Sequence, residues 1–318
     1  MNERIPLGVS SCLLGNDVRY DGGHQRDRYI ADTLAPYFSF VPVCPEVECG
    51  LPVPREAMRL VAAENGPVRL ITIRTRQDLT EQMESWCRQR VDELASEELC
   101  GFIFKKNSPS SGLHRVKLYH PAGLSSRSEG RGLFAHAFVR RFPLIPVEEE
   151  GRLHDAQLRE NFIERVFAMK RWRDFLHQEP DYRILIQFHT AQKLLIMAHH
   201  PSKYQAMGRL VAQGKEVPRD ELLATYGRLY LQSLQAFATV KQNTNVLQHT
   251  MGYFREYLTA DEKAELLEIL EDYRGHQVPL TVPLTLVKHY IRKYDIQYLQ
   301  GQVYLSPHPA ELMLRNHV

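Results

Sequence analysis

Five cysteines are the residues with the most distinctive chemistry in this sequence, and all of them lie within its first hundred positions. The chain continues to residue 318 without another cysteine. An odd number of cysteines, in a chain long enough to bury a hydrophobic core, argues against a disulfide scaffold. In a reduced intracellular protein, clustered cysteines more often bind a metal or take part in catalysis. They are Cys12, Cys44, Cys49, Cys87 and Cys100.

Two of these cysteines are expected in the hydrophobic core. Cys87 lies on the apolar face of the amphipathic segment 78–99, where large apolar residues recur every three or four positions. Cys100 opens a predicted strand, and at about 3.3 Å per residue it lies about 16 Å from the far end of that strand. Both positions favour packing over reactivity.

The other three cysteines leave several kinds of site open. Four residues separate Cys44 from Cys49, which is not the two-residue spacing typical of structural zinc. A single nucleophilic cysteine needs a basic partner, for which His24 and His114 are candidates. A cluster held by cysteines from distant loops is chemically reasonable, although the spacing alone does not demand it.

Three polar loops each follow a predicted strand, at residues 11–24, 44–55 and 105–112. In a parallel α/β sheet the carboxyl ends of the strands meet at one edge, where ligands bind. We therefore expect Cys12, Cys44 and the third loop to lie close together at one site.

The predicted secondary structure that must position these loops differs between the first and the second half of the chain. In the first half, short apolar runs alternate with helical patterns, which predicts a Rossmann-like α/β domain with a largely parallel sheet. We expect two domains, residues 1–150 and an all-α domain at residues 151–318. The expected strands span residues 6–10, 39–44, 68–75, 100–105, 116–119 and 143–147. The expected helices span residues 78–99, 132–142, 154–177, 182–199, 201–213, 218–239, 245–257, 260–274 and 283–294.

Charge and hydropathy limit the classes of partner. Lys and Arg number 40 against 38 Asp and Glu, a net charge of +2, so a basic face for nucleic acid has to come from local patterning. No stretch approaches the ~20 apolar residues of a membrane span, and no secretory signal is visible. We expect a cytoplasmic protein with no membrane partner.

Several motifs of the first half occur together and in order: S-C-L-L-G, V-R-Y-D-G-G-H, C-P-E, G-L-P-V-P-R and F-K-K-N-S-P-S-S-G. Through them, residues 5–145 resemble the thiouracil desulfidase family (DUF523). Three stretches of the second half resemble the helical DUF1722 domain: His199–Ala212, Asn243–Phe254 and Tyr273–Arg292. Together the two halves are similar to the two-domain version that removes sulfur from 4-thiouridine in tRNA.

The resemblance implies a [4Fe–4S] cluster on three cysteines, with one iron left open for the thiocarbonyl sulfur of the substrate. Water then attacks the carbon, which gives a uracil-type product and hydrogen sulfide. Such chemistry is reasonable, because a soft iron–sulfur site prefers sulfur to oxygen and acts as a Lewis acid. By their motifs, Cys12 and Cys44 match two of the ligands. Glu46 matches the catalytic carboxylate that handles the water proton, and Ser108 matches a catalytic serine.

One position departs from the family pattern. Where the family has its third cysteine ligand, after S-P-S, this chain has Ser111. Three interpretations stay open: an engineered Cys→Ser substitution, a natural variant with Ser111 or Cys49 as third ligand, and a homologue without a cluster. Because a hydroxyl is a harder ligand than a thiolate, we expect a weaker or more oxygen-labile cluster.

Charged residues beside the motifs and along the helices are candidates for binding the substrate. In the loops, each candidate either lines the pocket or serves a local structural role: Arg19, Asp21, Arg55 and Lys105. In the helical half, three basic clusters are interpreted as an RNA-binding surface that tracks phosphates, with ordinary solvated faces as the alternative. Their members are Lys170, Arg171, Arg173, Lys203, Arg209, Lys288 and Arg292.

The favoured function is therefore hydrolytic desulfuration of 4-thiouridine in tRNA, whose base has to be exposed or flipped into the pocket. A desulfidase of free thiouracil-type bases and a non-catalytic RNA-binding protein stay open as alternatives. Scattered histidines of the helical half are expected to cap helices or pack in the core rather than bind a metal. They are His189, His199, His200 and His249.

Overall fold

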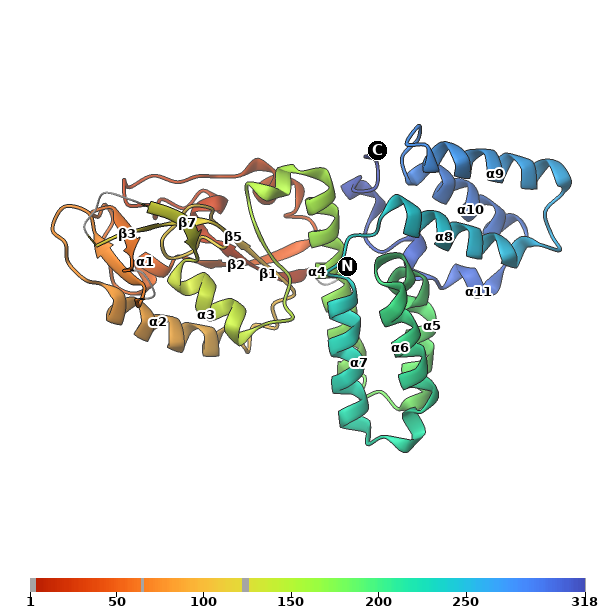
Figure 1. Ribbon diagram of the computed structural model, residues 1–318, viewed down its shortest axis with the longest axis horizontal. Helices are drawn as coiled ribbons and strands as arrows, with labels where there is room; N and C mark the ends of the chain where they lie inside the picture. The colour runs from red at the N-terminus through yellow and green to blue at the C-terminus, as the bar shows by residue number, and fades with distance from the viewer. Residues whose placement is uncertain (1–3, 64–65, 122–125, 318) are drawn as a thin grey trace. The chain divides into compact units, whose positions relative to one another are not determined.

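The computed structural model describes residues 4–63, 66–121 and 126–317, and it divides into two compact units after Leu158. The first unit combines sheets and helices and the second is largely helical (Figure 1), which confirms the predicted fold class. The elements of the first unit are β1 (Ile5–Ser10), β2 (Phe38–Val43), α1 (Pro45–Glu48), β3 (Met58–Val61), β4 (Arg69–Thr72), α2 (Thr80–Glu93), β5 (Phe102–Phe104), β6 (Val116–Tyr119), β7 (Ser126–Gly130), α3 (Leu133–Arg141) and β8 (Val147–Glu149).

Four strands form a fully parallel sheet in the order β2-β1-β5-β8. Because they run in one direction, the carboxyl ends of these strands share one edge of the sheet. Three of the expected strands are confirmed as β1, β2 and β5. The strand expected at residues 143–147 begins only at Val147, because Pro143 and Pro146 have no N–H group to donate to a ladder.

A second, mixed sheet has the order β4-β3-β6-β7. In it β3 runs antiparallel to β4 and parallel to β6, and β7 runs antiparallel to β6. The segments expected at residues 68–75 and 116–119 form β4 and β6. Sequence patterns do not predict β3 (M-R-L-V) or β7 (S-R-S-E-G), and β7 has no apolar side chain.

Helices α2 and α3 lie next to each other beside the parallel sheet (Figure 1). Phe134 and Phe138 of α3 meet Phe102 and Phe104 of β5, with ring centroids 4.8 to 6.0 Å apart. All four rings are fully buried. This aromatic cluster fixes β5, and with it the start of the loop that follows the strand.

Helices joined by short turns make up the second unit. All seven helices expected after residue 150 are present, with shifted ends. The fifth of them, expected at residues 245–257, begins at Val240 because Thr239 and Gln242 form a capping box. The helices are α4 (Ala156–His177), α5 (Tyr182–His199), α6 (Pro201–Ala212), α7 (Arg219–Ser233), α8 (Val240–Met251), α9 (Ala260–Arg274), α10 (Thr281–Lys293) and α11 (Gln297–Gln300).

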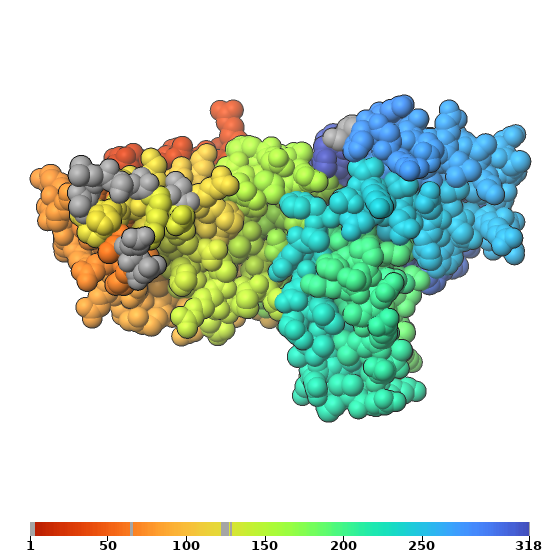
Figure 2. All heavy atoms as spheres, viewed as in Figure 1, coloured from red at the N-terminus to blue at the C-terminus, as the bar shows by residue number. Residues whose placement is uncertain are grey.

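The helical unit has an aromatic core of its own. Trp172 of α4 stacks on Phe175 and on Tyr226 of α7, with ring centroids 5.1 and 5.7 Å apart. Helices α6 and α7 lie side by side, and their side chains fill the space between the ribbons (Figure 2). Among the residues that the structure describes, no helix combines the length and apolar character needed to cross a membrane.

Candidate active site

A cavity of about 460 Å³ opens where β1, β2 and β5 end. Residues from all three polar loops form its walls, as the parallel topology predicts. The predicted site residues in its lining are Cys12, Arg19, Cys44, Glu46, Arg55, Lys105, Ser108 and Ser111. Two further candidates, Asp21 and Cys49, are not part of the lining.

Cys44 directly follows β2, and Cys12 lies two residues after the end of the neighbouring strand β1. Cys12 belongs to a 3₁₀ turn at residues 11–14, and Cys44 precedes the first residue of α1. The Cys44 backbone N–H donates to the Glu48 Oε1 at 2.7 Å, which fixes the start of that helix. Burial raises the pKa of the Cys12 thiol to about 11 and that of Cys44 to about 12, and the charge of Glu46 adds to both shifts. Without a ligand, both thiols therefore carry their protons at neutral pH.

The third loop is a tight turn that places Ser111 beside the cavity. The Ser111 N–H donates to the Ser108 Oγ at 3.1 Å, and Ser111 is only 3% exposed. Gly132, just before α3, is required for the close approach of this helix to the turn. A Cβ atom there would lie 2.3 Å from the Ser110 carbonyl oxygen. The turn thus holds a buried hydroxyl where the resemblance expects the third cluster ligand.

Two carboxylates at the carboxyl end of β8, one in its last residue and one in the next, hold the same loop in place. Glu150 accepts hydrogen bonds from the Lys105 Nζ at 2.5 Å and from the Lys106 N–H at 2.7 Å. Glu149 accepts from both backbone N–H groups of residues 113–114. Both glutamates are buried, so losing a partner would leave a buried charge uncompensated. Lys105, expected to bind substrate, lines the cavity while its ammonium is paired with Glu150.

Glu46 is the centre of a polar cluster on the cavity wall. Its Oε1 accepts from the Ser110 Oγ at 2.5 Å and from the Ser108 Oγ at 3.4 Å. Its Oε2 lies 3.5 Å from the Cys44 Sγ and 3.8 Å from the Arg55 Nη2. The Glu46 and Arg55 side chains are 13% and 7% exposed, so solvent screens their attraction only weakly. The cluster holds a carboxylate beside a buried thiol, where it can accept a proton from water.

Ser110 is the member of this cluster that sequence reasoning misses. It is fully buried, and its Oγ lies 2.9 Å from the Ser108 Oγ as well as within bonding distance of Glu46. The run S-P-S-S-G offers three hydroxyls, and the order of the residues does not say which of them turns toward a carboxylate. The sequence could have pointed to Ser110 only through this run of serines, because every serine of a loop at a ligand-binding edge is a candidate for the site.

Asp21 supports the cavity rim from outside. The Arg19 Nε lies 3.5 Å from the Asp21 Oδ1, and the Arg19 guanidinium also donates to Gln25. The Gly23 N–H donates to Asp21 at 3.1 Å, and this hydrogen bond lowers the pKa of the Asp21 carboxyl. Arg19 is thus held in the lining, whereas Asp21 acts through Arg19.

Cys49 and the candidate histidine bases are not part of the cavity lining. The Cys49 thiol donates a hydrogen bond to the Glu46 carbonyl oxygen, with the Sγ 3.2 Å from that oxygen. The described residues of the cavity lining include no histidine, and neither His24 nor His114 is among them. The described part of the lining therefore offers no histidine as the base of a cysteine nucleophile. The two cysteines predicted to pack in the core are buried, namely Cys87 and Cys100.

The donors at the cavity fit an iron–sulfur cluster through two thiols and one hydroxyl. Cys12, Cys44 and Ser111 are each at most 8% exposed and line the same cavity. Thiolates are the usual ligands of such clusters, whereas a serine oxygen is a harder donor. Because Cys49 is not in the lining, Ser111 is the third donor that the cavity itself provides at the expected position.

The first basic cluster of the helical unit serves contacts within that unit. Lys170 pairs with Asp174 one helical turn later. Arg171 donates from Nη1 to the Pro307 carbonyl at 2.7 Å. Arg173 is half-buried, as are the other two cations. These contacts leave less of the positive charge of this cluster exposed to bind a phosphate.

The other two basic clusters each contain one exposed arginine. Arg209 lies on α6 and Arg292 lies on α10. Lys203 and Lys288 of the same clusters are half-buried, and burial lowers the pKa of both ammonium groups. The two arginines are therefore the predicted RNA-binding residues with the most accessible charge.

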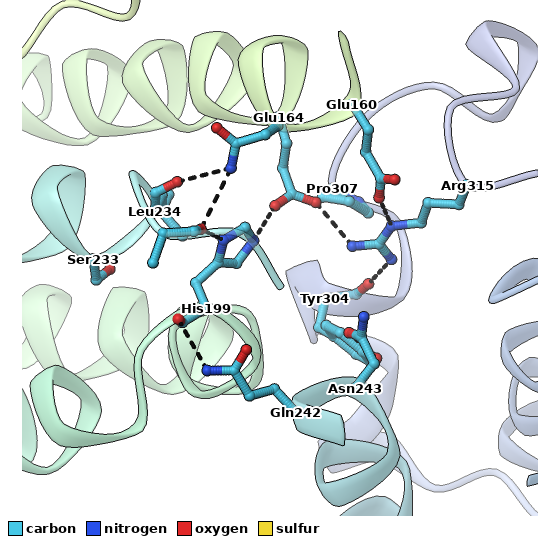
Figure 3. A network of polar contacts seen from close by, with 12 residues as sticks. Glu160, Glu164, His199, Ser233, Leu234, Gln242, Asn243, Tyr304, Pro307 and Arg315 are labelled. Carbon is cyan, nitrogen blue, oxygen red and sulfur yellow. Dashed lines mark hydrogen bonds and ion pairs between the residues drawn. The ribbon is translucent and has the colours of Figure 1, made fainter. Parts of the chain in front are cut away.

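A buried charge network ties the C-terminal segment to α4 (Figure 3). One oxygen of Glu164 faces His199, and the other lies 2.8 Å from the Arg315 Nη2. The Arg315 Nε lies 3.3 Å from Glu160. Although burial opposes ionisation, the charges of His199 and Arg315 hold the pKa of the Glu164 carboxyl well below its usual range. The network is thus a set of compensated charges inside the helical unit.

The same network brings three possible metal ligands together, one atom each from Glu160, Glu164 and His308, all within 4.8 Å of one another. Both carboxylates already contact Arg315. A divalent cation would have to displace this guanidinium from a fully compensated arrangement. The contacts therefore support a structural role.

The other helical histidines also occupy structural positions. His200 accepts from the Lys203 N–H at 3.4 Å and caps the start of α6. The His189 ring lies 3.1 Å from the Tyr226 hydroxyl in the interior of the unit. His200 and His189 thus agree with the expected capping and packing roles, whereas His249 is exposed on α8, where its ring contacts that of Tyr253.

Comparisons with known proteins match the two units separately. The family model for 2-thiouracil desulfurase matches residues 7–150, and DUF1722, a family of unknown function, matches residues 193–309. Uncharacterized protein YbgA of Escherichia coli K12 is 30% identical over 157 residues, 48% of this chain and 90% of YbgA. Uncharacterized protein YbbK of Bacillus subtilis 168 is 30% identical over 109 residues, 33% of this chain and 71% of YbbK. Among solved structures, the [4Fe–4S]-dependent thiouracil desulfidase TudS is 28% identical over 48% of this chain and 95% of its own, with a TM-score of 0.38.

Proposed function

This chain belongs to the 2-thiouracil desulfurase family through its N-terminal unit and to the DUF1722 family through its helical unit, and we propose that it removes sulfur from a thionated uracil by hydrolysis. The observation that carries the proposal is the Glu46 carboxylate, held by two serines in a cavity that also contains two buried thiols. In the overall reaction water supplies the new carbonyl oxygen and the sulfur leaves as hydrogen sulfide. No electrons are transferred.

We propose that Cys12, Cys44 and Ser111 hold a [4Fe–4S] cluster. When bound, the cluster would supply a soft Lewis acid for the thiocarbonyl sulfur. The two thiols have to lose their protons to bind iron. The positive charges of Lys105 and Arg19 favour the thiolate of Cys12 against the effect of burial.

The side chains around Glu46 provide for the proton of the attacking water. Glu46 accepts that proton as a general base, since its carboxylate lines the cavity. Ser108, also in the lining, is placed to hydrogen-bond the water or the base. Ser110 and Arg55 lie on opposite oxygens of the carboxylate and fix its orientation. This preorganisation leaves little reorientation to be made during the reaction.

We propose 4-thiouridine in tRNA as the substrate. Support comes from the motif resemblance and from the two exposed arginines of the helical unit, Arg209 and Arg292, which are free to meet phosphates. A thiobase inside stacked RNA has to leave the stack to reach a cavity of this kind. The proposal also places the protein in the cytoplasm, where it would meet tRNA.

The test uses the full chain, reconstituted anaerobically with iron and sulfide. We expect it to release hydrogen sulfide from tRNA that carries 4-thiouridine and to remove the thiocarbonyl absorbance of that tRNA. The double variant Arg209→Glu/Arg292→Glu should lose tRNA turnover, and its residual binding should respond less to salt. It should keep the turnover of free 4-thiouracil, because neither arginine belongs to the cavity.

Two other outcomes would support the alternatives. Release of sulfide from free thiouracil, with tRNA left unchanged, would identify a free-base desulfidase. A salt-dependent shift of tRNA on a gel, without sulfide release from any substrate, would identify a non-catalytic RNA-binding protein.

A further inference from the structure

We infer that Tyr20 is a stacking surface for the substrate base, and that its ring selects planar heteroaromatic thiones over non-aromatic thiocarbonyl compounds. The inference rests on the proposed function and specifies how the cavity chooses its substrate. Tyr20 is part of the cavity lining, yet it is 46% exposed. A large aromatic ring in this position contributes little to the core, so its surface is available to a ligand.

The backbone of Tyr20 is fixed although its ring is exposed. The Arg55 N–H donates to the Tyr20 carbonyl at 2.8 Å, which joins the first and second loops of the site. The Gly22 N–H donates to the Arg19 carbonyl at 3.0 Å and closes a turn around Tyr20. Gly22 has a φ of +81°, which favours glycine at this position. The ring is therefore presented at the cavity mouth by an anchored turn.

Arg19 orients the ring and adds to its suitability for stacking. The Arg19 guanidinium carbon lies 5.7 Å from the centroid of the Tyr20 ring. Arg19 is itself held by Asp21 and Gln25, so both partners of this contact are restrained. An aromatic ring beside a guanidinium is an arrangement that binds the π-faces of nucleobases without regard to sequence.

This placement separates recognition of the ring from recognition of the sulfur. The thiols and Ser111 are buried, whereas Tyr20 is at the exposed side of the same cavity. A planar six-membered ring can contact Tyr20 face to face while its exocyclic sulfur points inward. A small aliphatic thioamide carries the same sulfur but has no ring for Tyr20 to contact, so it loses this part of the binding energy.

The test measures binding and turnover of the nucleoside 4-thiouridine, which needs no RNA contact. For Tyr20→Ala we expect Kd and KM to rise roughly 5- to 50-fold, with kcat changed less than about twofold, as the loss of one base–aromatic stack implies. Tyr20→Phe keeps the ring and should behave like the wild type. Tyr257→Ala removes a tyrosine of similar exposure, 50%, from the helical unit and serves as the matched control. Thioacetamide, as the non-aromatic comparison, should be unaffected by Tyr20→Ala.

The results separate this inference from the function on which it rests. Wild-type affinity in Tyr20→Ala, or an equal loss in Tyr20→Phe, would overturn the stacking role. A wild-type protein that releases no sulfide, but whose binding of 4-thiouridine is weakened by Tyr20→Ala alone, would overturn the proposed reaction and keep the stacking surface. A wild-type protein that does not bind 4-thiouridine would overturn both.

Discussion

The Ser110 hydroxyl donates a hydrogen bond of 2.5 Å to the Glu46 carboxylate, across 64 positions of the chain. Ser110 is fully buried and Glu46 faces the cavity, so the contact joins the protein interior to the reaction space. The second hydroxyl on the same oxygen, that of Ser108, lies farther away at 3.4 Å. The shorter contact therefore does more to orient the carboxylate.

Replacing Ser110 by alanine should lower kcat about 10-fold and leave KM within about twofold, because the general base loses its orientation while the substrate contacts remain. Steady-state sulfide release checks the rates. Thermal unfolding of the same variant shows whether the fold is retained. A parallel rise in KM, or an unchanged kcat, would contradict the positioning role of Ser110.

Replacing Ser111 by cysteine should raise the iron and acid-labile sulfide bound per chain after anaerobic reconstitution, since a thiolate is a softer ligand than a hydroxyl. The visible absorbance of the cluster should rise in parallel. The double variant Cys12→Ser/Ser111→Cys has two thiols again and serves as the control, with iron content near that of the wild type. If Ser111→Cys gains no iron, position 111 is not a ligand.

Replacing Arg315 by methionine should destabilise the helical unit by about 3–5 kcal/mol, because Glu160 and Glu164 lose the cation between them (Figure 3). Urea unfolding of the full chain, followed by circular dichroism, measures the change. The double variant Arg315→Met/Glu164→Gln should recover part of the loss, since one buried charge is removed. A loss below about 1 kcal/mol would show that the network contributes little.

His189 should make the helical unit less stable in mild acid. Burial lowers the pKa of this ring to about 4 in the folded state. The usual value of about 6.5 applies to the unfolded chain. Between these values the unfolded state binds more protons, so the free energy of unfolding falls as the pH drops from about 6.5 to 4. Above about pH 6.5, His189 does not contribute to the pH dependence of the free energy of unfolding.

Replacing His189 by glutamine should therefore flatten the pH dependence of the free energy of unfolding between pH 6.5 and 4, whatever its cost at neutral pH. Urea titrations at a series of pH values measure this slope. His249→Gln, at an exposed position of α8, is the control and should leave the slope unchanged. An unaltered slope in His189→Gln would show that His189 is not the titrating group.

The parts of the site that lie at strand ends could be predicted from the sequence. Cys12 and Cys44 each follow an apolar run, and parallel strands bring such positions to one edge regardless of loop detail. The second sheet could be predicted only in part from the sequence, since β7 carries no alternating apolar pattern. Strand pairing with β6 stabilises that segment, and this pairing has no local signal.

Contacts between distant segments account for what sequence patterns miss. The role of Ser110 depends on a carboxylate that is far away in the chain. From the sequence, Lys105 and Arg171 were expected to bind substrate or RNA. In the structure, Lys105 forms an ion pair with Glu150, and Arg171 donates a hydrogen bond to the Pro307 carbonyl. A charge pattern gives the number of cations on a segment, whereas tertiary packing decides how many remain open to a ligand.

Sulfide release from thionated substrate by the full chain, after anaerobic reconstitution, tests the proposed desulfuration most directly. Wild-type and Glu46→Gln proteins are compared at equal iron content. We expect the wild type to convert 4-thiouridine to uridine with release of one hydrogen sulfide per base. Glu46→Gln should be slower by about 100-fold or more, because the general base is lost. Equal rates for the two proteins would contradict the role of Glu46, and no sulfide from iron-loaded wild type would contradict the proposed reaction.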